Sequence, residues 1–175
     1  MKNALLSLLL VILFLNLSWA QKHSFSIHLS NPIALFQKAG IKLEYKTSKI
    51  GLLLAGTQYY GNLPRYPGTQ LGVETRFYRN ATEKREDYIY GKILGGYQQA
   101  VAASGDGFFR REKVDAGNYY GAGIGLGRRY HFNHLFLDLQ GGLKYTQSDV
   151  PQADAFYITG PGSFLDLHLN FGFQF

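Results

Sequence analysis

Apolar and polar residues alternate with a period of two along most of the chain after residue 20, most clearly near its end. In residues 165–175 one face carries Leu165, Leu167, Leu169, Phe171, Phe173 and Phe175, and the other carries Asp166, His168, Asn170, Gly172 and Gln174. This is the period of a β-strand, whose successive side chains point to opposite faces. An apolar face of this kind meets either a protein core or lipid.

The alternation recurs along the chain and predicts an all-β fold, because no sustained helical period occurs after residue 20. The predicted strands are residues 22–29, 36–46, 49–60, 68–80, 86–101, 117–130, 134–147 and 163–175. Short links (47–48, 81–85 and 131–133) alternate with longer ones (61–67, 102–116 and 148–162), as in outer-membrane barrels. The first link, residues 30–35, is a turn, a bend within one long strand or a short helix, and either of the last two would reduce the count to seven.

The two faces of these strands differ in polarity. One face is apolar and carries Phe25, Ile27, Leu29, Ile41, Leu43, Tyr45, Leu71, Val73, Phe77, Ile89, Ile93, Tyr97, Tyr120, Ile124, Leu126, Leu135, Leu137, Leu139, Leu143 and Tyr145. The other is polar and carries Ser24, Ser26, His28, Lys42, Glu44, Glu74, Arg76, Lys92, Asp138, Gln140, Lys144, Asp166, His168 and Asn170. A soluble barrel has the polar face outside. The sequence therefore predicts an eight-stranded, antiparallel, closed transmembrane β-barrel, with the orientation of residues 49–60, apolar on both faces, left open.

The first twenty residues have the pattern of a cleaved secretory signal. Lys2 precedes an apolar run over residues 4–17, and Ala20 is a small residue at the expected cut. We therefore expect a signal peptide over residues 1–20 and one barrel domain over residues 21–175, with a net charge of +6 less Lys2, or +5. The sequence has no Cys, which excludes disulfides and thiolate metal sites. The basic residues are spread along an exported chain, so nucleic acid is not an expected partner.

Tyrosines fall mostly toward the predicted strand ends. This placement indicates either an aromatic girdle at the head-group level of a membrane or only the ordinary preference of Tyr for β-strands. The expected girdle contains Tyr45, Tyr59, Tyr60, Tyr78, Tyr88, Tyr90, Tyr97, Tyr119, Tyr120, Tyr130 and Tyr145.

The signal sequence, the alternating strands, the NFGFQF ending and the segments NPIALFQKAGIKLEY, GTQYYG and FYITGPGSF together resemble small outer-membrane β-barrel proteins of Gram-negative bacteria, in the size class of OmpA, OmpX and OmpW. The resemblance implies a location in the cell outer membrane, with lipid and lipopolysaccharide as partners. It also implies contact between the aromatic last strand and the barrel-insertion machinery during assembly. A monomer is favoured, and the resemblance brings no catalytic motif.

Charged side chains on the polar face suggest a filled interior, since an eight-stranded barrel is only wide enough for side chains. Four carboxylates face four cations there, a balance that favours a hydrogen-bonded plug over a charge-selective pore. The predicted interior plug consists of Lys42, Glu44, Glu74, Arg76, Lys92, Asp138, Lys144, Asp166 and His168.

Other motifs have structural interpretations. Gly121, Gly123, Gly125 and Gly127 recur every second residue, which does not match a dinucleotide loop. On one inward face they leave room for side chains from across the barrel or allow tight curvature. His131 and His134 flank a short turn without a nearby third ligand, so no metal site is expected. No cofactor site is expected either.

The predicted link 102–116 is either a mobile loop without a specific role or a binding surface. An exposed aromatic pair beside basic residues suits lipopolysaccharide phosphates or a partner protein. The residues are Phe108, Phe109, Arg110 and Arg111.

Three functions remain open: a structural or binding barrel acting through its external loops, a lipid A-modifying enzyme, and a soluble lipocalin-like carrier of a hydrophobic ligand. The enzyme would use Ser26, His28 and His168 with Asp166, if neighbouring first and last strands bring them together. No nucleophile elbow or oxyanion loop is visible, so the structural or binding role is favoured over catalysis.

Overall fold

A computed structural model describes residues 23–31, 38–60, 67–79, 82, 84–103, 111–149 and 164–175, with only the backbone for residues 100–103 and 111–115. The predicted signal peptide, residues 1–20, lies outside this part of the chain. No helix among the described residues is long and apolar enough to cross a membrane.

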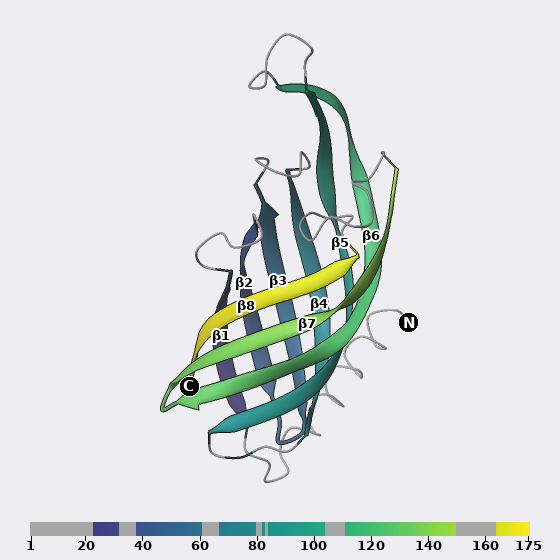
Figure 1. Ribbon diagram of the computed structural model, residues 1–175. Helices are drawn as coiled ribbons and strands as arrows, with labels where there is room; N and C mark the ends of the chain where they lie inside the picture. Colours follow the sequence, from purple (N-terminus) through teal and green to yellow (C-terminus); the bar gives the residue numbers. More distant parts are fainter. Residues whose placement is uncertain are drawn as a thin grey trace, which may run out of the picture.

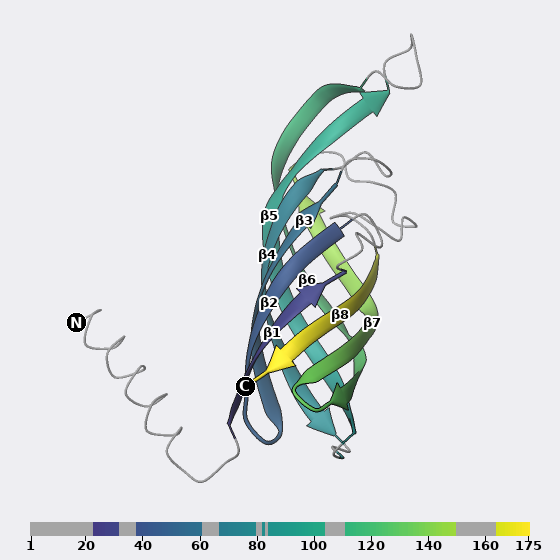
Figure 2. The ribbon, with the colours of Figure 1, turned by 90° about the vertical axis from the view of Figure 1, so that its left-hand side faces the viewer.

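The described residues form a closed, antiparallel, eight-stranded barrel (Figures 1 and 2). The strands are β1 (Ser24–Ser30), β2 (Lys38–Lys46), β3 (Ile50–Tyr59), β4 (Gly68–Arg79), β5 (Arg85–Ala103), β6 (Arg111–Phe132), β7 (Leu135–Ser148) and β8 (Leu165–Gln174). Each strand pairs with the next in the chain, and β1 pairs with β8 to close the sheet. This confirms the predicted all-β, closed, antiparallel barrel and its count of eight strands.

The first link joins two separate strands. Asn31 follows β1 with a φ of 51°, in the left-handed region that Asn tolerates better than most residues. β2 then runs back along β1, with Ser30 opposite Gly40. The alternative of one long bent strand is therefore wrong.

The hairpin of β5 and β6 is longer than predicted. Both views show it extending beyond the other strands (Figures 1 and 2), and the pairing continues to Ala103 opposite Arg111, past a register shift between Ala100 and Val101. Residues 111–116, predicted as part of a link, belong to β6 because antiparallel backbone hydrogen bonds continue where the apolar alternation has stopped. Of the predicted loop-binding set, Arg111 is the first residue of β6, and Phe108, Phe109 and Arg110 lie outside the described residues.

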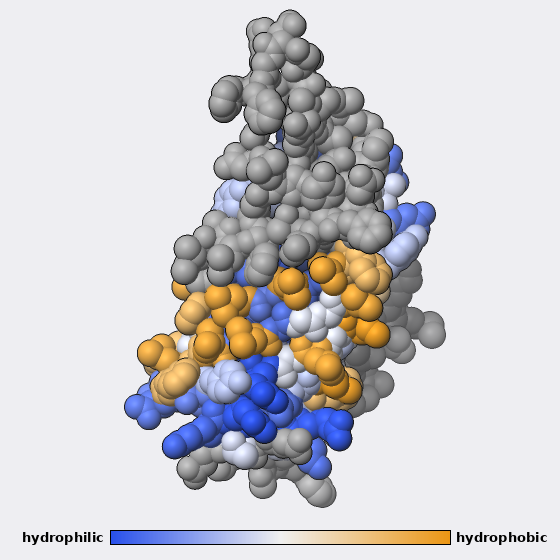
Figure 3. Space-filling model, viewed as in Figure 1, coloured by the Kyte–Doolittle hydropathy of each residue, from blue (hydrophilic) through white to orange (hydrophobic). Residues whose placement is uncertain are grey.

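The outer face is apolar and the inner face is polar. On the face that Figure 3 shows, the apolar side chains form an orange band, with a blue hydrophilic region below it toward the short turns. In β3 the side chains of Ile50, Leu52 and Leu54 face outward, while Leu53 is 0% exposed inside the barrel. The orientation of this strand, open from the sequence, is thereby determined.

Each short turn is closed by a specific local arrangement. Thr47 and Thr82 occupy equivalent positions: the amide of each donates to a carbonyl three residues later, that of Ile50 at 2.7 Å and that of Arg85 at 2.8 Å. The turn between β6 and β7 instead uses Asn133 at a φ of 58°. These turns place both described ends of the chain, near β1 and β8, at the same end of the barrel.

Candidate functional site in the barrel interior

Two buried carboxylates, Glu44 and Asp138, organise the half of the interior toward the short turns. Arg129 reaches both through Nη2, at 2.5 Å from Glu44 Oε2 and 3.4 Å from Asp138 Oδ2. Arg76 Nη1 donates to Asp138 Oδ2 at 2.6 Å, and the Tyr88 hydroxyl donates to Asp138 Oδ1 at 2.5 Å. Opposite charges this close, with hydrogen bonds on the remaining lone pairs, offset the cost of burying them.

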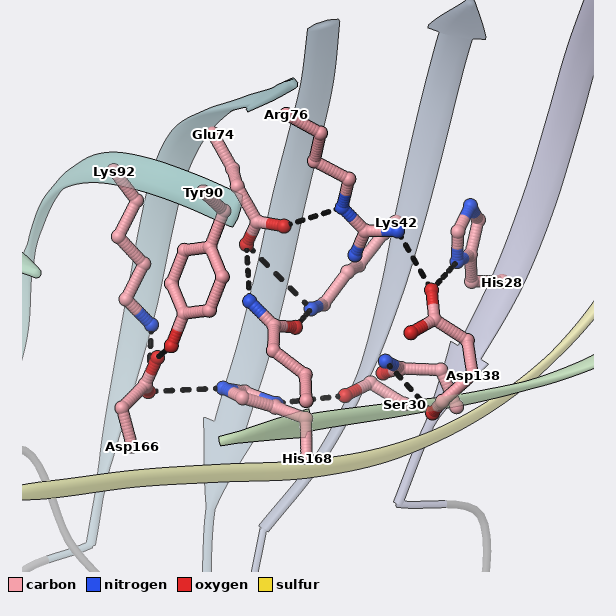
Figure 4. Close-up of polar contacts among 12 residues, drawn as sticks. His28, Ser30, Lys42, Glu74, Arg76, Tyr90, Lys92, Asp138, Asp166 and His168 are labelled. Carbon is pink, nitrogen blue, oxygen red and sulfur yellow. Dashed lines mark hydrogen bonds and ion pairs between the residues drawn. The ribbon is translucent and has the colours of Figure 1, made fainter. Parts of the chain in front are cut away.

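Glu74 extends this network along the barrel axis. It accepts from Arg76 Nε at 2.6 Å and from the Gln140 amide at 2.9 Å, and Lys42 Nζ lies 3.8 Å away (Figure 4). Lys42 in turn donates to Gln140 Oε1 at 2.7 Å. Arg76 therefore bridges Glu74 and Asp138, so the two groups form one connected network.

Asp166 is the centre of a second group, farther from the short turns. Its Oδ1 accepts from Lys92 Nζ at 2.6 Å and lies 3.1 Å from His168 Nε2, while the Tyr90 hydroxyl donates to Oδ2 at 2.7 Å (Figure 4). The other ring nitrogen of His168, Nδ1, lies 3.0 Å from the Ser30 hydroxyl.

The nine residues of the predicted plug all have side chains on the inner face of the described barrel. The prediction missed Arg129, Lys38, Lys46 and Glu86, which are also buried there. With these the described interior holds seven Lys and Arg side chains and five Asp and Glu side chains, rather than four of each. Alternation alone could have predicted three of these four. Arg129 is an even number of residues from the inward glycines of its strand, and Lys38 and Lys46 are each four residues from the inward Lys42.

The expected tyrosine girdle is partly wrong. Five of its members point inward and are buried: Tyr59, Tyr78, Tyr88, Tyr90 and Tyr119. Their hydroxyls find acceptors inside, as in the bond from Tyr78 to Glu44 and the bond of 3.0 Å from Tyr59 to Gln70. A β-strand position fixes the face on which a ring lies, so proximity to a strand end did not determine its direction.

Two of the four inward glycines of β6, Gly125 and Gly127, make room for rings of the neighbouring strand rather than for side chains from across the barrel. A Cβ at Gly127 would lie 2.1 Å from Tyr88 Cζ, and one at Gly125 would lie 2.5 Å from Tyr90 Cε1. Register pairs Tyr88 with Gly127 and Tyr90 with Gly125 on β5 and β6. The glycines thus let two rings lie flat against the wall, from where their hydroxyls reach Asp138 and Asp166.

The predicted serine, histidine and carboxylate set does not converge. His28 belongs to the Glu44 group and His168 to the Asp166 group. The same nitrogen of His28, Nε2, faces both Ser26 at 3.2 Å and Glu44 at 3.0 Å, whereas a relay needs one ring nitrogen for each partner.

A different serine, Ser30, forms a line with His168 and Asp166. Ser30 contacts Nδ1 of the His168 ring and Asp166 contacts Nε2. Ser30 and Asp166 are 1% exposed and His168 is 5% exposed. The cavity beside His168 is about 10 Å³, enough for about one water molecule. This arrangement is that of interior polar groups that satisfy one another.

His131 and His134 make separate contacts. His131 Nε2 lies 3.2 Å from Glu86 Oε2, and Glu86 also binds Lys46. His134 stacks on Phe173 instead, with ring centroids 5.7 Å apart. Among the described residues, no three His, Cys, Asp or Glu side chains are placed to hold one metal ion.

The barrel is similar to the N-terminal β-barrel domain of Pseudomonas aeruginosa OprF, with a TM-score of 0.61 and 16% sequence identity. The match covers 89% of this chain and 99% of that domain. The chain has the fold of a small outer-membrane β-barrel. No protein-family model matches the sequence, and no curated protein matches it significantly.

Proposed function

We propose that this chain spans the outer membrane as a barrel and has a structural or binding role there. The apolar outer face carries the proposal. From Ile89 to Tyr97, both exposed, β5 rises about 26 Å at about 3.3 Å per residue. A tilt of about 40° gives an apolar band of roughly 20 Å, near the height of about 25 Å typical of such barrels.

The polar interior is proposed as a plug that blocks ion flow. Arg76 of β4 reaches Asp138 on β7, and Arg129 of β6 reaches Glu44 on β2. Lys42 is joined to Glu74 and Gln140. These side chains are buried on all sides by each other and by the wall. A conducting pore would need a continuous water-filled path past them.

The proposed contacts with partners, with the insertion machinery and with lipid follow from where each surface lies on the barrel. The external links would supply the binding surface, including Phe108, Phe109 and Arg110. The apolar face of β8, with Phe171 and Phe173 exposed, would contact the insertion machinery during assembly. Lipid would cover the same face once the barrel is inserted.

Fractionation combined with heat-modifiability tests the membrane location. We expect the protein in the outer-membrane fraction, released only by detergent, and expect the unboiled sample to migrate differently from the boiled one on a gel. Recovery without detergent would instead support the soluble carrier. An identical migration before and after boiling would contradict a closed barrel in the membrane.

Two further measurements separate a plugged barrel from a pore or an enzyme. Planar-bilayer recordings should show no large, steady conductance, and such a conductance would contradict the plug. Mass spectrometry should show unchanged lipid A when His168→Ala replaces the parent protein in cells. A change in lipid A with His168→Ala present at parent levels would support the enzyme.

A further inference from the structure

A groove of about 570 Å³ lies on the outer wall at the short-turn end, across β4 to β7. Strand register places Arg79, Asp87 and Arg128 side by side on β4, β5 and β6, with Leu139 next on β7. All four side chains line the groove. Backbone pairing of the four strands therefore holds these four residues in one row across the sheet.

The row is cationic. Arg128 Nε donates to Asp87 Oδ1 at 2.6 Å, and Arg85, one step closer to the turn, places Nη2 3.6 Å from Asp87 Oδ2. Arg79 has an exposed side chain at the same level. Three guanidinium groups around one carboxylate leave a net charge of +2, because three minus one is two. The Arg128 and Asp87 side chains are 45% and 26% exposed, so the groups are accessible from outside the barrel.

An apolar surface begins directly beyond this row, away from the turns. Phe77, Ile89 and Leu126 are outward and exposed on β4, β5 and β6, in register with one another. The next position on β7 is Gly141, paired with Leu126, which has no side chain to fill the space. Ile89, Leu126 and Leu139 form the apolar part of the groove. In Figure 3 hydrophilic residues likewise gather below the apolar band on this side of the barrel.

We propose that this groove binds one anionic phospholipid of the membrane leaflet at the short-turn end. Its phosphate would lie between Arg79 and Arg128, and its acyl chains along Ile89, Leu126 and Leu139. Guanidinium groups suit phosphate because their forked donors match its oxygens, and a cationic site at the edge of an apolar band matches a lipid in both charge and polarity. The proposal rests on the membrane location proposed above and adds a defined lipid site to it.

Asp87 gives the proposal a directional test. It competes with a phosphate for Arg128 and Arg85. Its neutralisation by Asp87→Asn therefore raises the net charge from +2 to +3 and frees guanidinium donors, so lipid binding should become tighter. Loss of Arg79 and Arg128 together, as Arg79→Gln with Arg128→Gln, should weaken binding at least about tenfold, since each basic residue near a membrane surface contributes several-fold.

Native mass spectrometry of the detergent-solubilised protein measures this directly. The protein is titrated with phosphatidylglycerol, or with phosphatidylcholine of the same acyl chains. We expect one phosphatidylglycerol to bind first and more tightly than phosphatidylcholine. The matched control is Lys49→Gln, which removes an exposed cation at the turn between β2 and β3; it should leave the affinity unchanged.

Three results would overturn the lipid site: equal affinity for the two lipids, an equal loss in Lys49→Gln, or weaker binding in Asp87→Asn. Full displacement of phosphatidylglycerol by the same concentration of inorganic phosphate would also overturn it, since the acyl chains would then contribute nothing. Heat-modifiability of each sample separates this failure from failure of the proposed function. A protein that shifts on heating but does not distinguish the lipids keeps its membrane location and loses only the site.

Discussion

Removal of the Asp138 carboxylate should be among the most damaging single changes in the described interior. Asp138 is fully buried and accepts from Arg76 at 2.6 Å, Tyr88 at 2.5 Å and Arg129 at 3.4 Å. Asp138→Ala leaves two guanidinium groups with one carboxylate fewer in a site without bulk water. Breaking a buried ion pair from one side costs about 3–5 kcal/mol, and we expect a loss of that size in the free energy of unfolding.

Urea titration of the protein folded in lipid vesicles, with the folded fraction read from gel mobility, measures this loss. Asp138→Asn keeps the shape and one oxygen acceptor but removes the charge, so it should give an intermediate loss. Asp87→Asn is the matched control, because Asp87 also pairs with an arginine at 2.6 Å but on the outside of the barrel. An exposed pair contributes little, so this variant should unfold close to the parent.

The reasoning fails if Asp138→Ala folds and loses less than about 1 kcal/mol, the range of a surface pair. It also fails if Asp138→Ala and Asp87→Asn lose the same amount. A variant that does not fold leaves Asp138→Asn to decide the question, because its side chain is nearly the same size. In that case an unfolding midpoint equal to that of the parent would show that the charge of Asp138 does not stabilise the barrel.

Three smaller predictions concern the wall and the second interior group. Gly127→Ala should lower the urea midpoint, since its Cβ would lie 2.1 Å from the Tyr88 ring, whereas Gly91→Ala on β5 meets nothing within 4 Å and should not; equal midpoints would contradict the packing. Gly127→Ala should lower the urea midpoint less when Tyr88→Leu has removed the ring. The measurement compares the double variant with Tyr88→Leu alone in the same titration. Ser30→Ala should reduce stability by about 1 kcal/mol, because it removes the hydroxyl that lies 3.0 Å from His168 Nδ1, with no change in lipid A by mass spectrometry.

Strand number and sidedness were predictable because they depend on a period of two, and a membrane barrel leaves that period nearly unbroken. Leu71, Val73 and Phe77 face outward on β4 while Glu74 and Arg76 face inward, as alternation predicts. The long hairpin of β5 and β6 was not predictable in this way. Its outer part is held by backbone pairing, which leaves no hydrophobic pattern in the sequence.

The partners within the interior were less predictable than its residues. Alternation gives the face of Arg129 but not its choice of Glu44 and Asp138, which lie on β2 and β7. Those contacts depend on the stagger of the strands and on side-chain reach across the lumen. The inward tyrosines differ, because alternation does give the face of each ring. The expected interfacial role was wrong for them because it was based on their position near strand ends and not on that face.

The polar interior also determines how the strands align, as β3 shows. Residues 50–54 are apolar on both faces, so a slip of one residue would exchange Leu53 for Leu52 at little hydrophobic cost. The strands on either side lack this freedom. Leu53 pairs with Glu44 of β2 and with Glu74 of β4, and a slip of either strand would turn its interior charges outward toward the apolar band. Each Lys or Arg that such a slip turned toward lipid at the middle of a membrane would cost about 2–4 kcal/mol. Because the flanking strands are fixed by their charges, the uncharged strand between them takes its register from theirs.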